Sequence, residues 1–179
     1  MALDFSTEKV NMKTFFALMF CFALAVGAGW GQVPSEVVKA KVRMASEEAR
    51  PNSTVRAAVI VDVLPGYHIN DHHPTLDYLI PTEVKLEPST QVTVNDITYP
   101  KGELKRFAFS DTPLSVYEGT LRLDVAFQLD RKALPGSYEV KGKLRYQACN
   151  DHACLPPASV PLSFTFKVVR LGSSAGHSQ

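Results

Sequence analysis

The segment Leu121-Arg122-Leu123-Asp124-Val125-Ala126-Phe127-Gln128-Leu129 largely alternates apolar and polar side chains. Successive side chains of a β-strand point to opposite faces, so residues at every second position share a face. A helix would instead repeat its apolar positions every three or four residues. The segment therefore predicts a strand whose core-facing side chains are Leu121, Leu123, Val125, Phe127 and Leu129.

Similar runs lie on both sides of this segment and are separated by turn residues such as Pro65-Gly66 and Pro135-Gly136. No stretch shows a sustained helical period, and short strands at regular spacing are typical of an antiparallel sandwich. The sequence thus predicts an all-β fold with two antiparallel sheets. The other expected strands are Val37–Met44, Thr54–Leu64, Tyr67–Asn70, Leu79–Leu86, Gln91–Ile97, Leu104–Phe109, Ser137–Cys149 and Val160–Val169.

Length and charge exclude several classes of protein. A chain of 179 residues fits one domain, and a formal net charge of +1 with scattered basic residues indicates no nucleic acid or anionic membrane partner. The sequence has no Gly-rich phosphate loop and no convincing Ser-His-Asp arrangement, so we do not expect a hydrolase.

The first 31 residues differ from the rest. Lys13 precedes the apolar run 14–26, and small residues follow it. The run is shorter than the about 20 residues that span a bilayer, so the pattern is that of a secretory signal. Met12 also makes a good start, in which case residues 1–11 come from an over-extended gene model. The alternative is an uncleaved membrane anchor.

Cleavage of this signal would remove Cys21 and leave a periplasmic or otherwise exported protein, soluble after cleavage. We expect residues 1–31 to be the signal, residues 32–170 the domain, and the Gly/Ser-rich residues 171–179 a flexible tail. The exported protein then keeps two cysteines in a compartment that permits disulfides.

Those two cysteines, Cys149 and Cys154, are separated by four residues. A tight loop can bring their Cα atoms within the about 7 Å that a disulfide requires. A bridge over so short a loop stabilises by only about 2 kcal/mol in the chain-entropy model, against about 4.7 kcal/mol for a 100-residue loop. The usual immunoglobulin bridge joins strands far apart in sequence, so this pair is different.

Three roles for the pair remain open. An exposed pair in an oxidising compartment suits thiol–disulfide exchange, whereas the same pair could be a plain surface staple. Metal binding by Cys149, His152 and Cys154 lacks an evident fourth ligand. The histidines His68, His72 and His73 also lack a third ligand at suitable spacing, so we expect no metal and no cofactor.

The surroundings of the pair resemble a known family. The segment Tyr146–Pro157, followed by Val160-Pro161-Leu162, closely resembles the amino-terminal periplasmic domain of the thiol:disulfide interchange protein DsbD. Weaker likeness continues upstream in the expected order, and about residues 35–169 are covered. The upstream segments are Gly66–Asn70, Ile80–Thr82, Tyr99-Pro100 and Val116–Gly119.

The resemblance implies an immunoglobulin-like sandwich that relays reducing equivalents from a membrane electron donor to thioredoxin-like periplasmic proteins, of the disulfide isomerase or cytochrome-maturation type. It implies that Cys154 attacks the partner and that Cys149 resolves the mixed disulfide. A cap loop covers the pair in this family. Here it corresponds to residues 107–114, with Phe109 as the cap residue. Because the chain stops after one domain, the donor is expected to be a separate polypeptide.

Nearby charges would tune the pair. His152, when protonated, could stabilise a thiolate, whereas Asp151 and Asp111 would raise the thiol pKa. The alternative for His152 is an ordinary exposed loop residue. The alternative for the whole chain is a non-catalytic immunoglobulin-like binding or assembly module, in which the cysteine pair is a local staple.

Overall fold

The computed structural model describes residues 36–170, and none of these residues is helical. The described part therefore holds no helix that could cross a membrane. The expected signal segment (1–31), the expected tail (171–179) and Cys21 lie outside the described residues, so they stay predictions.

The first sheet confirms the strand read from the alternating segment. It has the order β1-β3-β9-β6, with every pair antiparallel. In β9 the five predicted core residues are buried, whereas Arg122 and Asp124 on the other face are exposed. The strands are β1 (Val38–Met44), β3 (Thr54–Val63), β9 (Thr120–Leu129) and β6 (Val92–Thr98).

The second sheet has the order β2-β12-β10-β5. Its strands are β2 (Glu48–Ala49), β12 (Ala158–Val168), β10 (Gly136–Tyr146) and β5 (Glu83–Leu86). The β2–β12 pair is parallel, and all other pairs are antiparallel. The two-residue strand β2 was not predicted, because two residues are too few to show a period.

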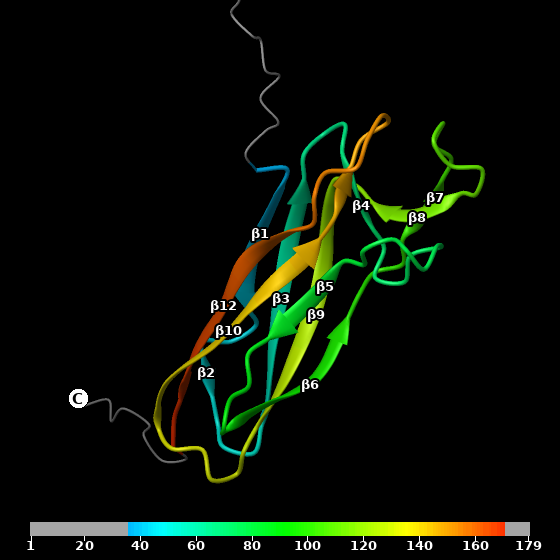
Figure 1. Ribbon diagram of the computed structural model, residues 1–179. Coiled ribbons are helices and arrows are strands. Elements are labelled where there is room, and N and C mark those ends of the chain that lie inside the picture. The colour runs from blue at the N-terminus through cyan, green and yellow to red at the C-terminus, as the bar shows by residue number, and fades with distance from the viewer. Residues whose placement is uncertain (1–35, 171–179) are drawn as a thin grey trace, which may run out of the picture. The chain divides into compact units, whose positions relative to one another are not determined.

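The two long sheets pack face to face (Figure 1). Phe127 of β9 and Phe164 of β12 are both fully buried, and their rings meet edge to face with centroids 5.1 Å apart. Valine and leucine side chains from both sheets form one core around them. The predicted all-β, immunoglobulin-like antiparallel sandwich is therefore confirmed.

A third, smaller sheet was not expected. It has the order β11-β4-β8-β7, and Figure 1 shows its labelled strands gathered at one end of the sandwich. It is formed by β11 (Ala148–Cys149), β4 (His68–Asn70), β8 (Leu114–Tyr117) and β7 (Glu103–Lys105). This sheet carries the cysteine pair, so the candidate site lies outside the two main layers.

Two expected strands are shorter than predicted. The run Leu79–Leu86 is a strand only from Glu83, because Pro81 has no N–H to donate to a ladder. The run Leu104–Phe109 ends as a strand at Lys105. The chain then turns, and the Ser110 N–H donates to the Phe107 carbonyl over 3.1 Å.

The predicted Pro65-Gly66 turn sets the start of β4. Gly66 has φ = +83°, a backbone conformation that residues with a Cβ rarely adopt. The Tyr67 N–H closes the turn by donating to the Leu64 carbonyl over 3.0 Å. The turn thus directs the chain from β3 into the small sheet.

Candidate functional site

The cysteine pair owes its position to a change of sheet. A single strand over Ser137–Cys149 was predicted, but β10 leaves β12 after Tyr146, and β11 pairs with β4 instead. In this ladder Cys149 lies directly opposite His68. Partners in an antiparallel ladder point to the same face, with Cβ atoms about 4.5–5.5 Å apart. The switch therefore brings Cys149 next to an imidazole.

Cys149 and Cys154 form a disulfide, with Cα atoms 3.9 Å apart. The loop between them has its own hydrogen bonds. The Asn150 side-chain oxygen accepts from the His152 and Ala153 N–H groups, each over 2.9 Å. Leu155 N–H donates to the Ala148 carbonyl over 2.8 Å. The loop is thus held on both sides of the bridge by bonds that do not depend on it.

The two sulfurs have unequal access to solvent. Cys149 is 1% exposed, whereas Cys154 is an exposed residue. Cys154 is therefore the member of the pair that lies at the surface, while Cys149 is shielded. In thiol–disulfide exchange the accessible sulfur is the one that is attacked or that attacks.

His68, considered from the sequence only as a metal ligand, lies beside the cysteine pair. It is 2% exposed, and its Nε2 has no hydrogen-bond partner among residues 36–170. Burial lowers the pKa of the imidazole below its ordinary value, which favours the neutral ring. From the sequence alone, His68 is one histidine in an expected strand. Its pairing with Cys149 joins segments far apart in the chain, so no local pattern could reveal it.

Two phenylalanine rings of the segment predicted to be the cap lie in line with His68. The Phe107 ring stacks on the imidazole, with centroids 4.2 Å apart and planes 23° apart. Phe109, the predicted cap residue, stacks on Phe107 at 5.3 Å and is 45% exposed. The aromatic contacts thus run from Phe109 through Phe107 to His68, which makes Phe107 the ring next to the site and Phe109 the outer ring.

The charged residues predicted to tune the pair are exposed. Asp111 lies in the turn before β8, and Asp151 and His152 lie in the cysteine loop. Among residues 36–170 no ion pair or side-chain hydrogen bond joins the Asp111 or His152 side chain to another residue. Their effect on the thiol pKa stays a prediction.

A buried carboxylate fixes the base of the small sheet. Asp71, just after β4, accepts hydrogen bonds from the Tyr117 hydroxyl and from the Ser115 hydroxyl, the latter over 2.7 Å. Burial alone would raise the pKa of Asp71, but these hydrogen bonds hold it below its ordinary value. Burial and the nearby carboxylate raise the pKa of Tyr117. The cluster therefore ties β4 to β8.

The adjacent histidines pack as structural residues. His72 stacks on Tyr99 at 3.7 Å, and its Nδ1 lies 3.0 Å from the Thr82 carbonyl. His73 meets His72 edge to face. Among residues 36–170 no three His, Cys, Asp or Glu side chains come together as a metal site would require.

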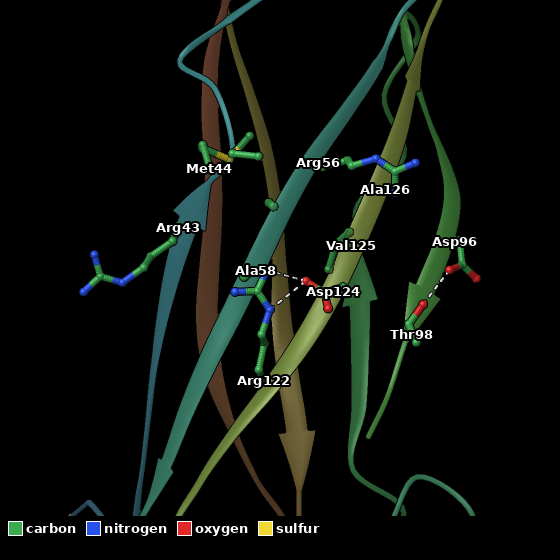
Figure 2. Close-up of a pocket in the computed structure, with 12 residues that line it drawn as sticks. Arg43, Met44, Arg56, Ala58, Asp96, Thr98, Arg122, Asp124, Val125 and Ala126 are labelled. Carbon is green, nitrogen blue, oxygen red and sulfur yellow. Dashed lines mark hydrogen bonds and ion pairs between the residues drawn. The ribbon is translucent and has the colours of Figure 1, made fainter. Parts of the chain in front are cut away.

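A separate groove lies on the outer face of the β1-β3-β9-β6 sheet and has a volume of about 440 Å³ (Figure 2). Its floor contains the small side chains of Ala58 and Ala126. Beside them, the Arg122 guanidinium donates a hydrogen bond to the Asp124 carboxylate over 2.7 Å. None of its lining residues belongs to the small sheet or to the cysteine loop. The groove is therefore distinct from the candidate site.

Comparison with known protein families finds a match over most of the described residues. The family model described as "Thiol:disulfide interchange protein DsbD, N-terminal" matches residues 36–163. No curated protein matches the chain.

Solved structures with low sequence identity resemble the fold. The N-terminal periplasmic domain of ScsB from Proteus mirabilis is 15% identical, with a TM-score of 0.52 over 75% of this chain and 49% of that one. The reduced N-terminal domain of DsbD from Neisseria meningitidis is 18% identical, with a TM-score of 0.48. The match covers 76% of this chain and 94% of that one. A chain from the complex of the DsbD and PilB N-terminal domains from Neisseria meningitidis is 19% identical, with a TM-score of 0.44. The match covers 76% of this chain and 88% of that one. At these identities the likeness concerns the fold alone.

Proposed function

The chain belongs to the family of the N-terminal domain of the thiol:disulfide interchange protein DsbD, and from that premise we propose that it is an extracytoplasmic thiol–disulfide exchange module. It passes reducing equivalents from a membrane electron donor to thioredoxin-like periplasmic proteins. Cys149 and Cys154 carry the electrons, without a bound cofactor.

The observation that supports this role most directly is the unequal burial of one disulfide. A partner thiolate can approach Cys154, which is exposed, and cannot approach Cys149, which is 1% exposed. A plain staple needs no such asymmetry. The loop is also held by Asn150 and by the Leu155–Ala148 bond, so it needs little help from a bridge.

The reaction consists of two exchanges. In the reduced module, the Cys154 thiolate attacks one sulfur of the partner's disulfide, which forms a mixed disulfide and releases the other partner sulfur as a thiolate. The Cys149 thiolate then attacks the Cys154 sulfur. The Cys149–Cys154 bond forms, the bond between Cys154 and the partner breaks, and the partner leaves with two electrons. The donor's dithiol reduces the module by the same steps in reverse.

Trapping tests this assignment. We would incubate reduced Cys149→Ser protein with an oxidised, purified thioredoxin-like periplasmic domain and separate the products on a non-reducing gel. A mixed disulfide through Cys154 should accumulate, because the module has no second thiol to complete the exchange and the partner's released thiolate can only reverse the first step. Cys154→Ser protein is the matched control and should trap little, because its remaining thiol is shielded.

Other outcomes overturn parts of the proposal. Trapping by Cys154→Ser protein alone would reverse the roles of the two cysteines. If neither variant traps the domain and the wild-type disulfide resists reduced thioredoxin, the pair is a structural staple. The chain would then be a non-catalytic binding or assembly module.

A further inference from the structure

His68 combines burial with an unpaired nitrogen. It is 2% exposed, yet within the described part of the chain Nε2 has no hydrogen-bond partner. An unpaired buried polar atom costs about 1–3 kcal/mol, so such atoms are rare and call for an explanation. The β4–β11 ladder sets the imidazole directly opposite Cys149, on the same face of the small sheet.

The oxidised state explains the unpaired nitrogen. A sulfur in a disulfide carries no proton, so Cys149 has nothing to donate to His68. After reduction Cys149 gains an S–H group, which can donate to a neutral imidazole nitrogen. Reduced Cys149 thus offers the nitrogen a donor that the disulfide does not.

The imidazole is held in place for this contact. The Phe107 ring stacks on the imidazole, with centroids 4.2 Å apart, and shields it from solvent. Burial lowers the pKa of His68, the negative charges of Glu118 and Asp151 act against burial, and Lys105 acts with it. The net lowering keeps the ring neutral and able to accept a proton near pH 7. Glu118 and Asp151 are both exposed, so neither shares the buried position of the Cys149 sulfur.

Resting on the proposed function, we propose that His68 is the proton acceptor for the Cys149 thiol in the resolving step. The neutral imidazole takes the proton from the Cys149 sulfur, and the resulting thiolate attacks the Cys154 sulfur of the mixed disulfide. The partner sulfur leaves as a thiolate. The proton held by His68 passes to that leaving group or to water. When a donor reduces the pair, the imidazolium returns a proton to Cys149.

This role answers a difficulty that burial creates. Only a thiolate is nucleophilic, and burial in apolar surroundings raises the pKa of a thiol. Cys149 is 1% exposed, so water has little access to its proton. An adjacent buried base gives the proton an acceptor without exposing the resolving sulfur to stray oxidants.

Ellman's reagent separates the two chemical steps. In a stopped-flow experiment with reduced protein in excess, attack by Cys154 releases one thionitrobenzoate, and resolution by Cys149 releases the second. Cys149→Ser protein should show the first release only, which identifies the phases. Rates would be measured from about pH 6 to about pH 9, which brackets the ordinary pKa values of histidine and cysteine.

Two variants remove the base in different ways. His68→Phe keeps a ring for Phe107 to stack on, and His68→Gln keeps hydrogen-bonding groups, but neither accepts a proton. We expect both to slow the second phase about tenfold or more at pH 7 and to leave the first phase nearly unchanged. The deficit should shrink as the pH rises, because hydroxide then ionises Cys149. His72→Phe is the matched control, since His72 also stacks on an aromatic ring but pairs with a backbone carbonyl away from the cysteines.

A second phase as fast as wild type in both variants at every pH would overturn the proposal. Equal slowing of both phases, independent of pH, would overturn it too, because that result indicates a structural effect on the cap. The reagent replaces the biological partner, so this test does not depend on trapping. If the trapping experiment fails while the second phase still depends on His68, the relay function is wrong and the proton transfer stands.

Discussion

Cys149 and Cys154 share one disulfide but differ in environment: Cys149 is 1% exposed, whereas Cys154 is exposed. The difference arises because Cys149 ends a strand that pairs with β4, and Cys154 lies beyond the loop on its other side. One cysteine of the bridge thus lies at the surface, and the other is enclosed by the small sheet.

This difference predicts unequal alkylation of the reduced protein. Iodoacetamide should modify Cys154 at least about tenfold faster than Cys149, because exposing Cys149 requires a local opening that costs more than about 1.4 kcal/mol. Mass spectrometry of peptides from short reaction times measures both rates. Denatured protein is the control, and there the two rates should converge. Equal rates in the folded protein would contradict the shielding of Cys149.

The cap predicts a graded effect of two aromatic substitutions on reduction by dithiothreitol. An aromatic stack contributes about 0.5–1.5 kcal/mol, so Phe107→Ala should speed reduction of the disulfide about two- to tenfold. Phe109→Ala should leave the fold intact and have a smaller effect, because Phe109 is 45% exposed and its ring stacks on Phe107, which in turn stacks on His68. A larger effect at Phe109 would make it the principal cap residue.

Loss of the disulfide should cost little stability. The loop it closes is short, so replacing both Cys149 and Cys154 with alanine should lower the free energy of unfolding by about 2 kcal/mol or less. Urea unfolding of the double variant and of the oxidised wild type measures this difference. A loss well above that value would show that the bridge is chiefly a structural element.

The buried carboxylate predicts both a stability cost and a pH dependence. Tyr117→Phe removes a donor to Asp71 and should cost about 1–3 kcal/mol in urea unfolding at pH 7. The pKa of Asp71 is lower in the folded protein than in the unfolded chain, so its contribution is complete above the ordinary carboxyl value of about 3.9. That contribution should disappear as the pH falls through the lowered folded value.

Asp71→Asn tests whether Asp71 is the origin of this pH dependence of stability. The variant should unfold with a weaker pH dependence below about pH 4, since the titrating group is gone. Asp111→Asn is the matched control, because Asp111 is exposed and has no hydrogen-bond partner among residues 36–170. If the free energy of unfolding of Asp71→Asn changes with pH as steeply as that of the wild type, other carboxylates are responsible for the acid sensitivity.

Local pattern by itself determined the all-β class and most strands. The alternation in Leu121–Leu129 requires only that neighbouring side chains face opposite ways, and the structure buries those five apolar residues. The spacing of Cys149 and Cys154 likewise predicted a bridged loop, because four intervening residues can close it locally. These features depend on chain geometry over a few residues.

Only the tertiary structure decided what surrounds the cysteines. The break in the strand after Tyr146, the register that opposes Cys149 to His68, and the stacking of Phe107 on that histidine join segments far apart in sequence. No periodicity encodes such a register, because it depends on which strand edge is free when the sheets assemble. Burial of one sulfur and of the imidazole follows from that register, and with it the chemistry proposed for the pair.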